Sequence, residues 1–297
     1  MNKKFIKSPL NYTGGKYKLL PQILPLFPKD INTFVDLFCG GCNVAVNVNA
    51  NNIVCNDIEP HVIDMMKYFQ KNSPDSVING VKEIVNKYGL SDTSKYGYEY
   101  YGCNSSKGVA NYNKDSYNRL RNDYNKNTDD SLYFFTTVIF AFNNQINFNK
   151  SGKFNVAVNK RDFNKNVKNN TFEFVNYLNN NPIEFQKSDF RCFNYDNLTS
   201  EDFVYCDPPY LISCASYNEQ DGWNEEKEKQ LLELLDKLNE KEIKFALSNV
   251  LYHKGKTNNI LIEWCKKYKV HHLNNTYSNC SYHGNKGESD EVLICNY

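Results

Sequence analysis

The chain has 297 residues, of which 40% are hydrophobic, and its 35 basic and 34 acidic residues leave a net charge of +1. This length and apolar content suffice for a full hydrophobic core with an attached lobe, and no apolar run approaches the length of a membrane span. Because Met1–Phe5 lacks the apolar region of a signal peptide and the ten cysteines suit a reducing interior, we expect a cytoplasmic location.

The first predicted element is a glycine-rich loop, Asn11–Lys16, which opens an amphipathic helix from Tyr17 to Leu26. A phosphate-cradling Walker loop needs four residues between its glycines, whereas Gly14 and Gly15 are adjacent. The loop is therefore too short for a Walker-type phosphate site.

Two short strands with a glycine turn between them come next. Thr33–Phe38 is apolar and runs into Gly40-Gly41 and a predicted helix from Asn43 to Asn49, which is the strand, turn and helix of a nucleotide-type site. The next predicted strand, Asn52–Asp57, ends in an acid about 20 residues after the acid of the first strand, a separation at which a carboxylate can bind ribose hydroxyls. Asp57 is therefore the candidate for ribose binding.

The glycine turn also carries Cys39 and Cys42, a Cys-x-x-Cys pair. A zinc site usually has a second pair of ligands at similar spacing, and neither the other cysteines nor the five histidines supply one. We therefore interpret the pair as small packing residues and expect no metal, with a redox or zinc role as the alternative.

The middle of the chain, residues 71–142 and 171–182, is predicted to be helical. Asp115–Asn125 is polar and amphipathic, and Leu132–Phe142 is apolar enough to be buried. Residues 219–242 hold nine acids against four lysines and carry five leucines, so they predict a surface helix that faces away from nucleic acid.

A basic stretch, residues 143–170, holds six basic residues against one acid. It mixes phosphate-neutralising and base-reading side chains, since it also contains ten asparagines and Phe148, Phe154 and Phe163. Asn147–Val158 alternates around Ser151-Gly152, which predicts a β-hairpin, and a two-stranded ribbon fits the major groove of DNA. An ordinary solvated surface is the alternative interpretation of such a run.

A third apolar strand, Phe203–Cys206, ends in the tetrapeptide Asp207-Pro208-Pro209-Tyr210. An aromatic amine such as adenine N6 is a poor nucleophile because its lone pair is delocalised, and two acceptors aimed at its N–H groups favour the reactive pyramidal form. The Asp207 carboxylate and the Pro208 carbonyl supply two acceptors on a rigid backbone. Tyr210 supplies a ring on which an extruded base stacks, worth about 1–3 kcal/mol. The alternative is a strand that simply ends in a Pro-Pro turn.

The order of these segments resembles one family. Tyr12–Lys16, Phe34–Gly41, Asn56-Asp57, Asp207–Tyr210 and two late predicted strands, Phe245–Asn249 and Glu291–Tyr297, resemble the motifs of the Dam-type (D12 class, alpha group) DNA adenine-N6 methyltransferases over nearly the whole chain. The resemblance implies an α/β fold with a Rossmann-like S-adenosylmethionine-dependent methyltransferase sheet. It also implies a catalytic domain from residues 1–70 and 185–297, and an inserted helical and β-hairpin DNA-recognition lobe at residues 71–184.

The resemblance also assigns site residues. It implies direct methyl transfer from S-adenosylmethionine to N6 of a flipped adenine in double-stranded DNA, with the catalytic residues Asp207, Pro208, Pro209 and Tyr210. It implies a donor site of Tyr12, Gly14, Gly15, Lys16, Asp36, Phe38, Gly40, Asp57 and Asp207. The DNA-binding candidates are Asn11, Asn144, Asn147, Asn149, Lys150, Lys153, Asn155, Ala157, Lys160 and Arg161.

Three positions depart from the family pattern. Asn147 stands where the hairpin typically has Arg, Ala157 where it has Pro, and Asn11 where members of the GATC class often have Lys. Arg and Lys suit guanine edges and Asn suits adenine, so these departures argue against GATC as the target.

Other functions stay open at this point. The same geometry serves a cytosine-N4 or an RNA amino methyltransferase, and a catalytically inactive sequence-specific DNA-binding protein would keep the fold. Protein glutamine methylation is a further alternative, although its sites generally carry Asn where Asp207 stands. We expect a monomer, with a dimer as the alternative. The sequence leaves open whether a cognate restriction endonuclease accompanies the chain, and whether it is a phage or orphan methylase.

Overall fold

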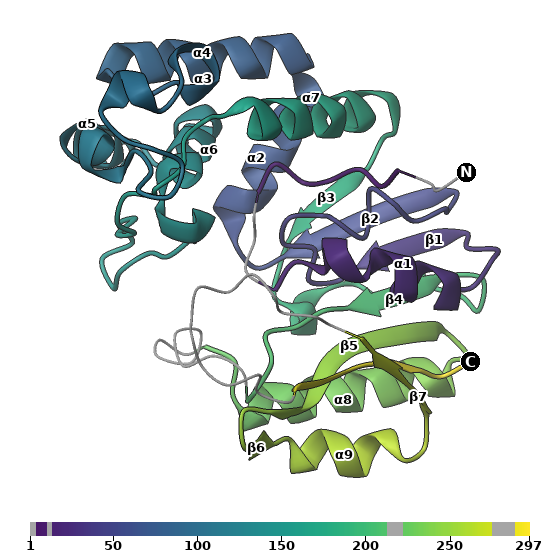
Figure 1. Cartoon of the computed structure of the whole chain (residues 1–297). Coiled ribbons are helices and arrows are strands. Elements are labelled where there is room, and N and C mark those ends of the chain that lie inside the picture. The colour runs from purple at the N-terminus through teal and green to yellow at the C-terminus, as the bar shows by residue number, and fades with distance from the viewer. Residues whose placement is uncertain (1–3, 11–13, 213–221, 275–288) are drawn as a thin grey trace. The chain divides into compact units, whose positions relative to one another are not determined.

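The computed structural model describes residues 4–10, 14–212, 222–274 and 289–297. Asn11 and Tyr12, two of the predicted site residues, lie outside the described residues. The chain packs as two compact units (Figure 1). Unit 1 comprises Met1–Gly15, Gly40–Val46 and Glu59–Phe185, and unit 2 comprises Lys16–Cys39, Asn47–Ile58 and Gln186–Tyr297.

A mostly parallel β-sheet forms the centre of unit 2. Its strand order is β3-β2-β1-β4-β5-β8-β7, with β6 paired to β5. β1 is parallel to β2 and β4, β4 is parallel to β5, and β8 is antiparallel to both β5 and β7. The strands are β1 (Thr33–Asp36), β2 (Asn52–Asp57), β3 (Glu184–Lys187), β4 (Phe203–Cys206), β5 (Lys244–His253), β6 (Lys256–Thr257), β7 (Lys269–Leu273) and β8 (Ser289–Cys295). The predicted α/β class with a Rossmann-like sheet is confirmed.

Helices and loops cover both faces of this sheet, which explains why β4 and the centre of β1, Phe34 and Val35, are apolar. On one face, alternate residues such as Val35 and Val204 pack with the leucines of α8 (Glu225–Glu240) and with α9 (Asn259–Cys265). On the other face, Phe34, Phe203 and Tyr205 surround the ring of Phe27. The surface helix predicted within residues 219–242 is confirmed as α8.

The predicted helix from Tyr17 to Leu26 is present but broken. It consists of three short pieces, η1 (Lys16–Leu19), α1 (Leu20–Ile23) and η2 (Leu24–Leu26). Pro21 and Pro25 lack a backbone N–H and interrupt regular helical hydrogen bonding, so each proline starts a new piece.

The helix predicted from Asn43 to Asn49 is wrong, because this segment forms a turn. Cys42 has a φ of +57°, which lies in the left-handed region, and one backbone hydrogen bond runs from Val46 to Cys42. Asn43 uses its side chain to accept a hydrogen bond from the Ser8 backbone instead of supporting a helix. Asparagine side chains compete with helical hydrogen bonds in this way.

Unit 1 is mainly helical, and its centre is α6, whose residues Phe134–Phe140 are all buried. α6 packs against α2, α3 and α5, and Asp130 caps its first turn by accepting hydrogen bonds from Leu132 and Tyr133. The longer helices of unit 1 are α2 (Pro60–Lys71), α3 (Pro74–Tyr88), α5 (Ala110–Tyr124), α6 (Ser131–Phe140) and α7 (Lys165–Asn180). Its shorter helices are α4 (Thr93–Tyr96), η3 (Glu99–Tyr101) and η4 (Phe142–Asn144). The short helix η5 (Phe190–Cys192) belongs to unit 2. The helices predicted at Asp115–Asn125 and Leu132–Phe142 are confirmed.

The domain boundaries near residues 70 and 185, and the roles given to the domains, stay predictions. Among the described residues, no helix combines the length and the apolar character that crossing a membrane requires.

Candidate active site

The sheet of unit 2 has a switch point between β1 and β4, since the strand order runs from β1 to β2 on one side and from β4 to β5 on the other. Ligands of open parallel sheets bind outside the carboxyl ends of the strands at such a point. Asp36 ends β1 and is paired with Tyr205 near the end of β4, and Asp57 ends the neighbouring β2. The tetrapeptide from Asp207 to Tyr210 therefore begins at the edge where ligands are expected.

An ion pair between a buried lysine and a partly buried aspartate forms the centre of the candidate site. The Lys16 Nζ atom at the start of η1 lies 2.8 Å from Asp207 Oδ1, and the Lys16 side chain is 4% exposed. Burial raises the pKa of the Asp207 carboxyl above its usual range, and the Lys16 ammonium opposes this shift. Lys16 therefore favours the ionised form of Asp207, in which both oxygens accept hydrogen bonds.

Tyr210 is joined to the same cluster. Its hydroxyl lies 3.3 Å from Asp207 Oδ1 and 3.1 Å from Glu291 Oε1, and Lys16 Nζ lies 4.9 Å from the centre of its ring. Lys16, Asp207 and Tyr210, three of the residues predicted from the sequence, are thus brought together by the fold.

Glu291 was missed by sequence reasoning. This residue of β8 is 3% exposed, and its Oε1 lies 3.7 Å from Lys16 Nζ as well as within reach of Tyr210. The available signal was a glutamate at the head of the apolar run Val292–Ile294, because a carboxylate that enters a buried strand needs partners.

The remaining predicted donor residues are divided between the units. In unit 2, Asp36 is buried, Asp57 is half-buried, and the Phe38 ring lies 5.5 Å from that of Phe190 and 5.6 Å from that of Trp223. In unit 1, Gly14 and Gly40 have φ values of +80° and +44°, a region that favours glycine, and Gly15 is exposed. The donor-binding roles of these residues stay predictions.

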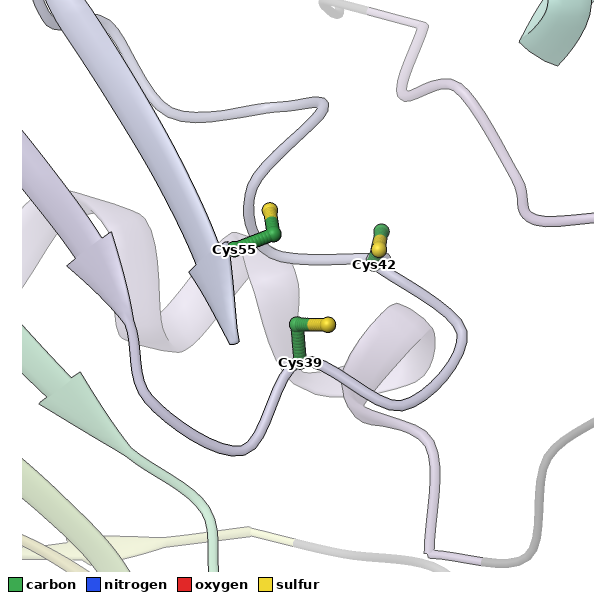
Figure 2. Close-up of side chains that lie close together, drawn as sticks. All are labelled: Cys39, Cys42 and Cys55. Carbon is green, nitrogen blue, oxygen red and sulfur yellow. The ribbon is translucent and has the colours of Figure 1, made fainter. Parts of the chain in front are cut away.

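The cysteines of the glycine turn have a neighbour that their spacing did not predict. Within unit 2, the sulfur atoms of Cys39 and Cys55 lie within 4.8 Å of one another, and both residues are buried. Figure 2 shows them together with Cys42, which follows Cys39 by three residues. Cys55 was overlooked because β2, and not the local sequence, supplies it. The predicted absence of a metal stays a prediction.

The predicted hairpin in unit 1 exists, but not as a regular two-stranded ribbon. It is held by two isolated antiparallel bridges, Phe148 with Phe154 and Ala141 with Val158. At its tip, the Asn149 side chain accepts hydrogen bonds from the backbone of Ser151 and Lys153. These side-chain bonds replace part of the strand ladder, which explains why the ribbon is short.

The hairpin presents polar and basic side chains to the solvent. The Asn147 amide donates to Asn155 Oδ1 across the hairpin at 2.8 Å, and Arg161 donates to the Tyr98 hydroxyl and the Ser105 carbonyl. Of the DNA-binding candidates, those that are exposed are Asn147, Lys150, Lys153, Asn155, Ala157, Lys160 and Arg161.

Two features of the basic stretch differ from the prediction. Phe154 and Phe163 are each 1% exposed, so they anchor the basic stretch to the core and the base-reading role predicted for them is wrong. Phe148 is half-buried and stacks on His61 at 4.4 Å, and its role stays a prediction. The Asn144 amide donates to the Val138 and Ile139 carbonyls at the end of α6. The Asn144 side chain therefore helps to terminate α6. A contact between Asn144 and DNA stays a prediction.

The sequence of the chain is similar to that of known DNA methyltransferases. Residues 12–279 match the family model of the D12 class N6 adenine-specific DNA methyltransferases. The chain is 43% identical to the type II methyltransferase M.FokI of Planomicrobium okeanokoites and 42% identical to the modification methylase StsI of Streptococcus sanguinis, with 99% of this chain aligned in each case.

The chain spans 43% of the length of each of those two relatives. A more distant relative, the DNA adenine methylase of Escherichia coli K12, is 23% identical over 98% of this chain and 94% of its own length. With a family model that covers most of the chain and two relatives above 40% identity, the chain belongs to the D12 class of N6 adenine-specific DNA methyltransferases.

Proposed function

We propose that the chain is a site-specific DNA adenine-N6 methyltransferase that takes its methyl group from S-adenosylmethionine. The observation that carries this proposal is the ion pair of Lys16 and Asp207 at the carboxyl end of β4, followed by Pro208, Pro209 and Tyr210. The family supports the reaction class, and the described geometry supports these residues as the ones that perform it.

The tetrapeptide prepares the target amine for attack. The ionised Asp207 carboxylate and the Pro208 carbonyl accept hydrogen bonds from the two N6 hydrogens, which favours the pyramidal nitrogen with an available lone pair. Lys16 favours the ionised form of Asp207 and so opposes the effect of burial, which raises the pKa of this carboxyl. Because Pro208 and Pro209 fix the backbone, the acceptors are aligned before the reaction begins.

The donor set fits a positively charged ligand. Lys16, Asp207 and Glu291 combine one ammonium with two carboxylates, so the cluster carries a net negative charge when its groups are ionised. In unit 2, Lys16, Asp36, Phe38 and Asp57 would hold S-adenosylmethionine, with the Asp57 carboxylate accepting hydrogen bonds from ribose hydroxyls. When bound, S-adenosylmethionine would supply an electrophilic methyl group on a sulfonium. Direct attack by the N6 lone pair would form the N–C bond as the S–C bond breaks, with S-adenosylhomocysteine as the leaving group and loss of one proton from N6.

A covalent enzyme–base intermediate is not part of this proposal. The thiol nearest the tetrapeptide in sequence is Cys206, which is fully buried in β4. Burial raises the pKa of this thiol well above its usual range, which disfavours the thiolate that nucleophilic attack on a cytosine ring requires.

Unit 1 would hold the duplex. Lys150, Lys153, Lys160 and Arg161 are exposed and carry the charge needed for phosphate contacts, while Asn147 and Asn155 are suited to base edges. The target adenine must leave the stack to reach the tetrapeptide, and the Tyr210 ring would receive it.

The names of the relatives suggest a biological setting. StsI is a modification methylase and M.FokI is a type II methyltransferase, so we extend the proposal to the modification part of a restriction–modification system with a cognate endonuclease. The chain would act in the cytoplasm on double-stranded DNA as a monomer.

Expression in cells that lack DNA methylation tests the proposed function. Nucleoside mass spectrometry should detect N6-methyladenine, and single-molecule sequencing should place it at one short motif other than GATC. Detection of N4-methylcytosine in place of N6-methyladenine would show that the chain methylates cytosine and would overturn the proposed substrate. Donor binding without any modified base would support the inactive DNA-binding protein.

A further inference from the structure

Glu291 lies in an interior strand of the sheet, whereas the tetrapeptide follows the end of a strand. Glu291 is part of β8, which is bonded on both sides, and is paired with Val250 of β5 and with Leu273 of β7. Its side chain is 3% exposed, and its Oε1 lies 3.1 Å from the Tyr210 hydroxyl and 3.7 Å from Lys16 Nζ. The Glu291 carboxylate can therefore orient both the Tyr210 hydroxyl and the Lys16 ammonium.

The Tyr210 hydroxyl has two carboxylates within reach but only one hydrogen to donate. Its oxygen lies 3.1 Å from Glu291 Oε1 and 3.3 Å from Asp207 Oδ1. The shorter distance favours Glu291 as the acceptor. Each hydrogen bond that Tyr210 gives to Glu291 leaves a lone pair of Asp207 for another donor.

We propose that Glu291 is a positioning residue for methyl transfer, which shares the Tyr210 hydroxyl with Asp207 and so limits how strongly this hydroxyl competes with the target amine for the Asp207 carboxylate. This inference rests on the proposed function, in which Asp207 accepts from N6. Nothing in the match to the family assigns a role to Glu291.

The same contact orients the Tyr210 ring. Lys16 Nζ lies over one face of the ring at 4.9 Å, and Glu291 fixes the hydroxyl end. A base that stacks on Tyr210 therefore uses the opposite face of the ring. Lys16 and Glu291 together fix the orientation of the Tyr210 ring, and this orientation sets the plane of a base that stacks on it.

Glu291 also influences the charge of Asp207. Burial is the main cause that raises the pKa of the Asp207 carboxyl, and the negative charge of Glu291 adds to it, while Lys16 and the Tyr210 hydroxyl oppose it. Among the described residues, Tyr205 and Cys206 also lie close to Asp207, and burial raises their pKa values, so they stay neutral. The charge of Asp36 acts on both of these groups as well. Replacing Glu291 by glutamine should therefore lower the pKa of Asp207.

Four variants separate these effects: Glu291→Ala, Glu291→Gln, Tyr210→Phe and the double variant Glu291→Ala/Tyr210→Phe. Asp290→Asn is the matched control, since Asp290 is the neighbouring acid of β8 and bonds to His272. In Glu291→Ala the Tyr210 hydroxyl turns to Asp207 and competes with the amine, so kcat should fall about tenfold or more, as for the loss of a hydrogen bond to a charged group. KM for DNA should stay unchanged.

The double variant gives the decisive comparison. Phenylalanine at position 210 has no hydroxyl and cannot donate a hydrogen bond to Asp207. The double variant should therefore transfer methyl groups faster than Glu291→Ala and at the rate of Tyr210→Phe. A purely structural role for Glu291 predicts the reverse, because two structural losses add. A double variant slower than Glu291→Ala would overturn the inference. Glu291→Gln keeps the acceptor, so kcat at saturating S-adenosylmethionine should fall less than in Glu291→Ala, with the acid limb of its pH profile moved to lower pH.

A second measurement needs no turnover. Carbon-13 NMR of the aspartate carboxyls reads the pKa of Asp207, and the Tyr210→Phe change should raise that pKa more in the Glu291→Ala background than in the wild-type background. If the wild type makes no methylated base but this difference appears, the proposed function fails and the placement of Tyr210 by Glu291 stands. An equal change in the two backgrounds, with an active wild type, would refute the inference alone.

Discussion

The Lys16 ammonium lies 2.8 Å from Asp207 Oδ1, and this contact joins the start of the first helical segment of unit 2 to the tetrapeptide that follows β4. The Lys16 side chain is 4% exposed and that of Asp207 is 17% exposed, so Lys16 is the main counter-charge of a carboxylate that water reaches only in part. Removing one partner of a buried ion pair typically costs about 3–5 kcal/mol, because the remaining charge stays without a counter-charge. Two of the segments that carry the resemblance to the family, Tyr12–Lys16 and Asp207–Tyr210, are therefore energetically coupled.

Lys16→Met should move the pH dependence of methyl transfer. Burial already raises the pKa of Asp207, and loss of the opposing ammonium should raise it further, so the acid limb of kcat should shift to higher pH. The free energy of unfolding should fall as the pH rises through this raised pKa, because ionisation of Asp207 is easier in the unfolded chain. Rates and thermal melts across a pH series test both shifts; an unmoved acid limb would show that Asp207 does not control it.

Asp207→Ala should abolish methyl transfer and leave duplex binding largely intact. The carboxylate is the acceptor that activates the amine, and loss of such a preorganised group should reduce kcat by at least about a hundredfold. Unit 1 would hold the duplex, so the free energy of DNA binding should change by less than about 0.5 kcal/mol. Fluorescence anisotropy measures binding, and Glu233→Gln, an exposed change on α8, is the control. Equal loss of both properties would refute this division between the units.

The sequence predicted the sheet better than it predicted the contacts between side chains. The apolar strands at Val35 and Val204 were recognised because parallel strands buried on both faces are continuously hydrophobic. The turn after β1 was mistaken for a helix because the φ of +57° at Cys42 leaves no pattern in the sequence. Glu291 joins Lys16 through tertiary structure alone, so neither spacing nor composition places it in the site.

Lys150→Ala and Lys153→Ala should weaken binding to all DNA sequences alike. Both side chains are exposed near the tip of the hairpin, where contacts with phosphates would release counterions. Each change should reduce the slope of log K against log salt by about 1. Lys229→Ala, on the acidic helix α8, is the control, because its ammonium lies near Glu225. An unchanged salt slope would show that Lys150 and Lys153 do not contact phosphates.

Asn147→Arg should change which site is methylated more than how fast the best site is methylated. The Asn147 amide donates to Asn155 Oδ1 at 2.8 Å, so the change frees Asn155 and introduces a side chain suited to guanine edges. Genome-wide mapping of methylated adenines measures the preference, and Asn155→Ala shows how much of the change comes from breaking the asparagine pair. The hairpin is wrongly assigned if Asn147→Arg leaves the preferred motif unchanged.

Gly108→Ala should destabilise the chain and weaken DNA binding through the basic stretch. Gly108 has a φ of +70°, and a Cβ there would lie 2.3 Å from the Lys160 carbonyl oxygen, which accepts a hydrogen bond from Val109. The methyl group would force Lys160 and the adjacent Arg161 to move. Gly89→Ala is the matched control, since Gly89 has a φ of +67° and nothing within 4 Å of its Cβ.

The control should therefore cost about 1 kcal/mol from backbone strain alone, and Gly108→Ala should cost at least about 1–3 kcal/mol more, as for an overpacked site. Chemical denaturation measures the free energy of unfolding, and anisotropy measures binding below the unfolding transition. Because Gly108 contacts the backbone of Lys160, weaker binding by Gly108→Ala and not by Gly89→Ala would connect this contact to the DNA interface. Equal binding by the two variants would show that the position of Lys160 and Arg161 does not affect the affinity for DNA.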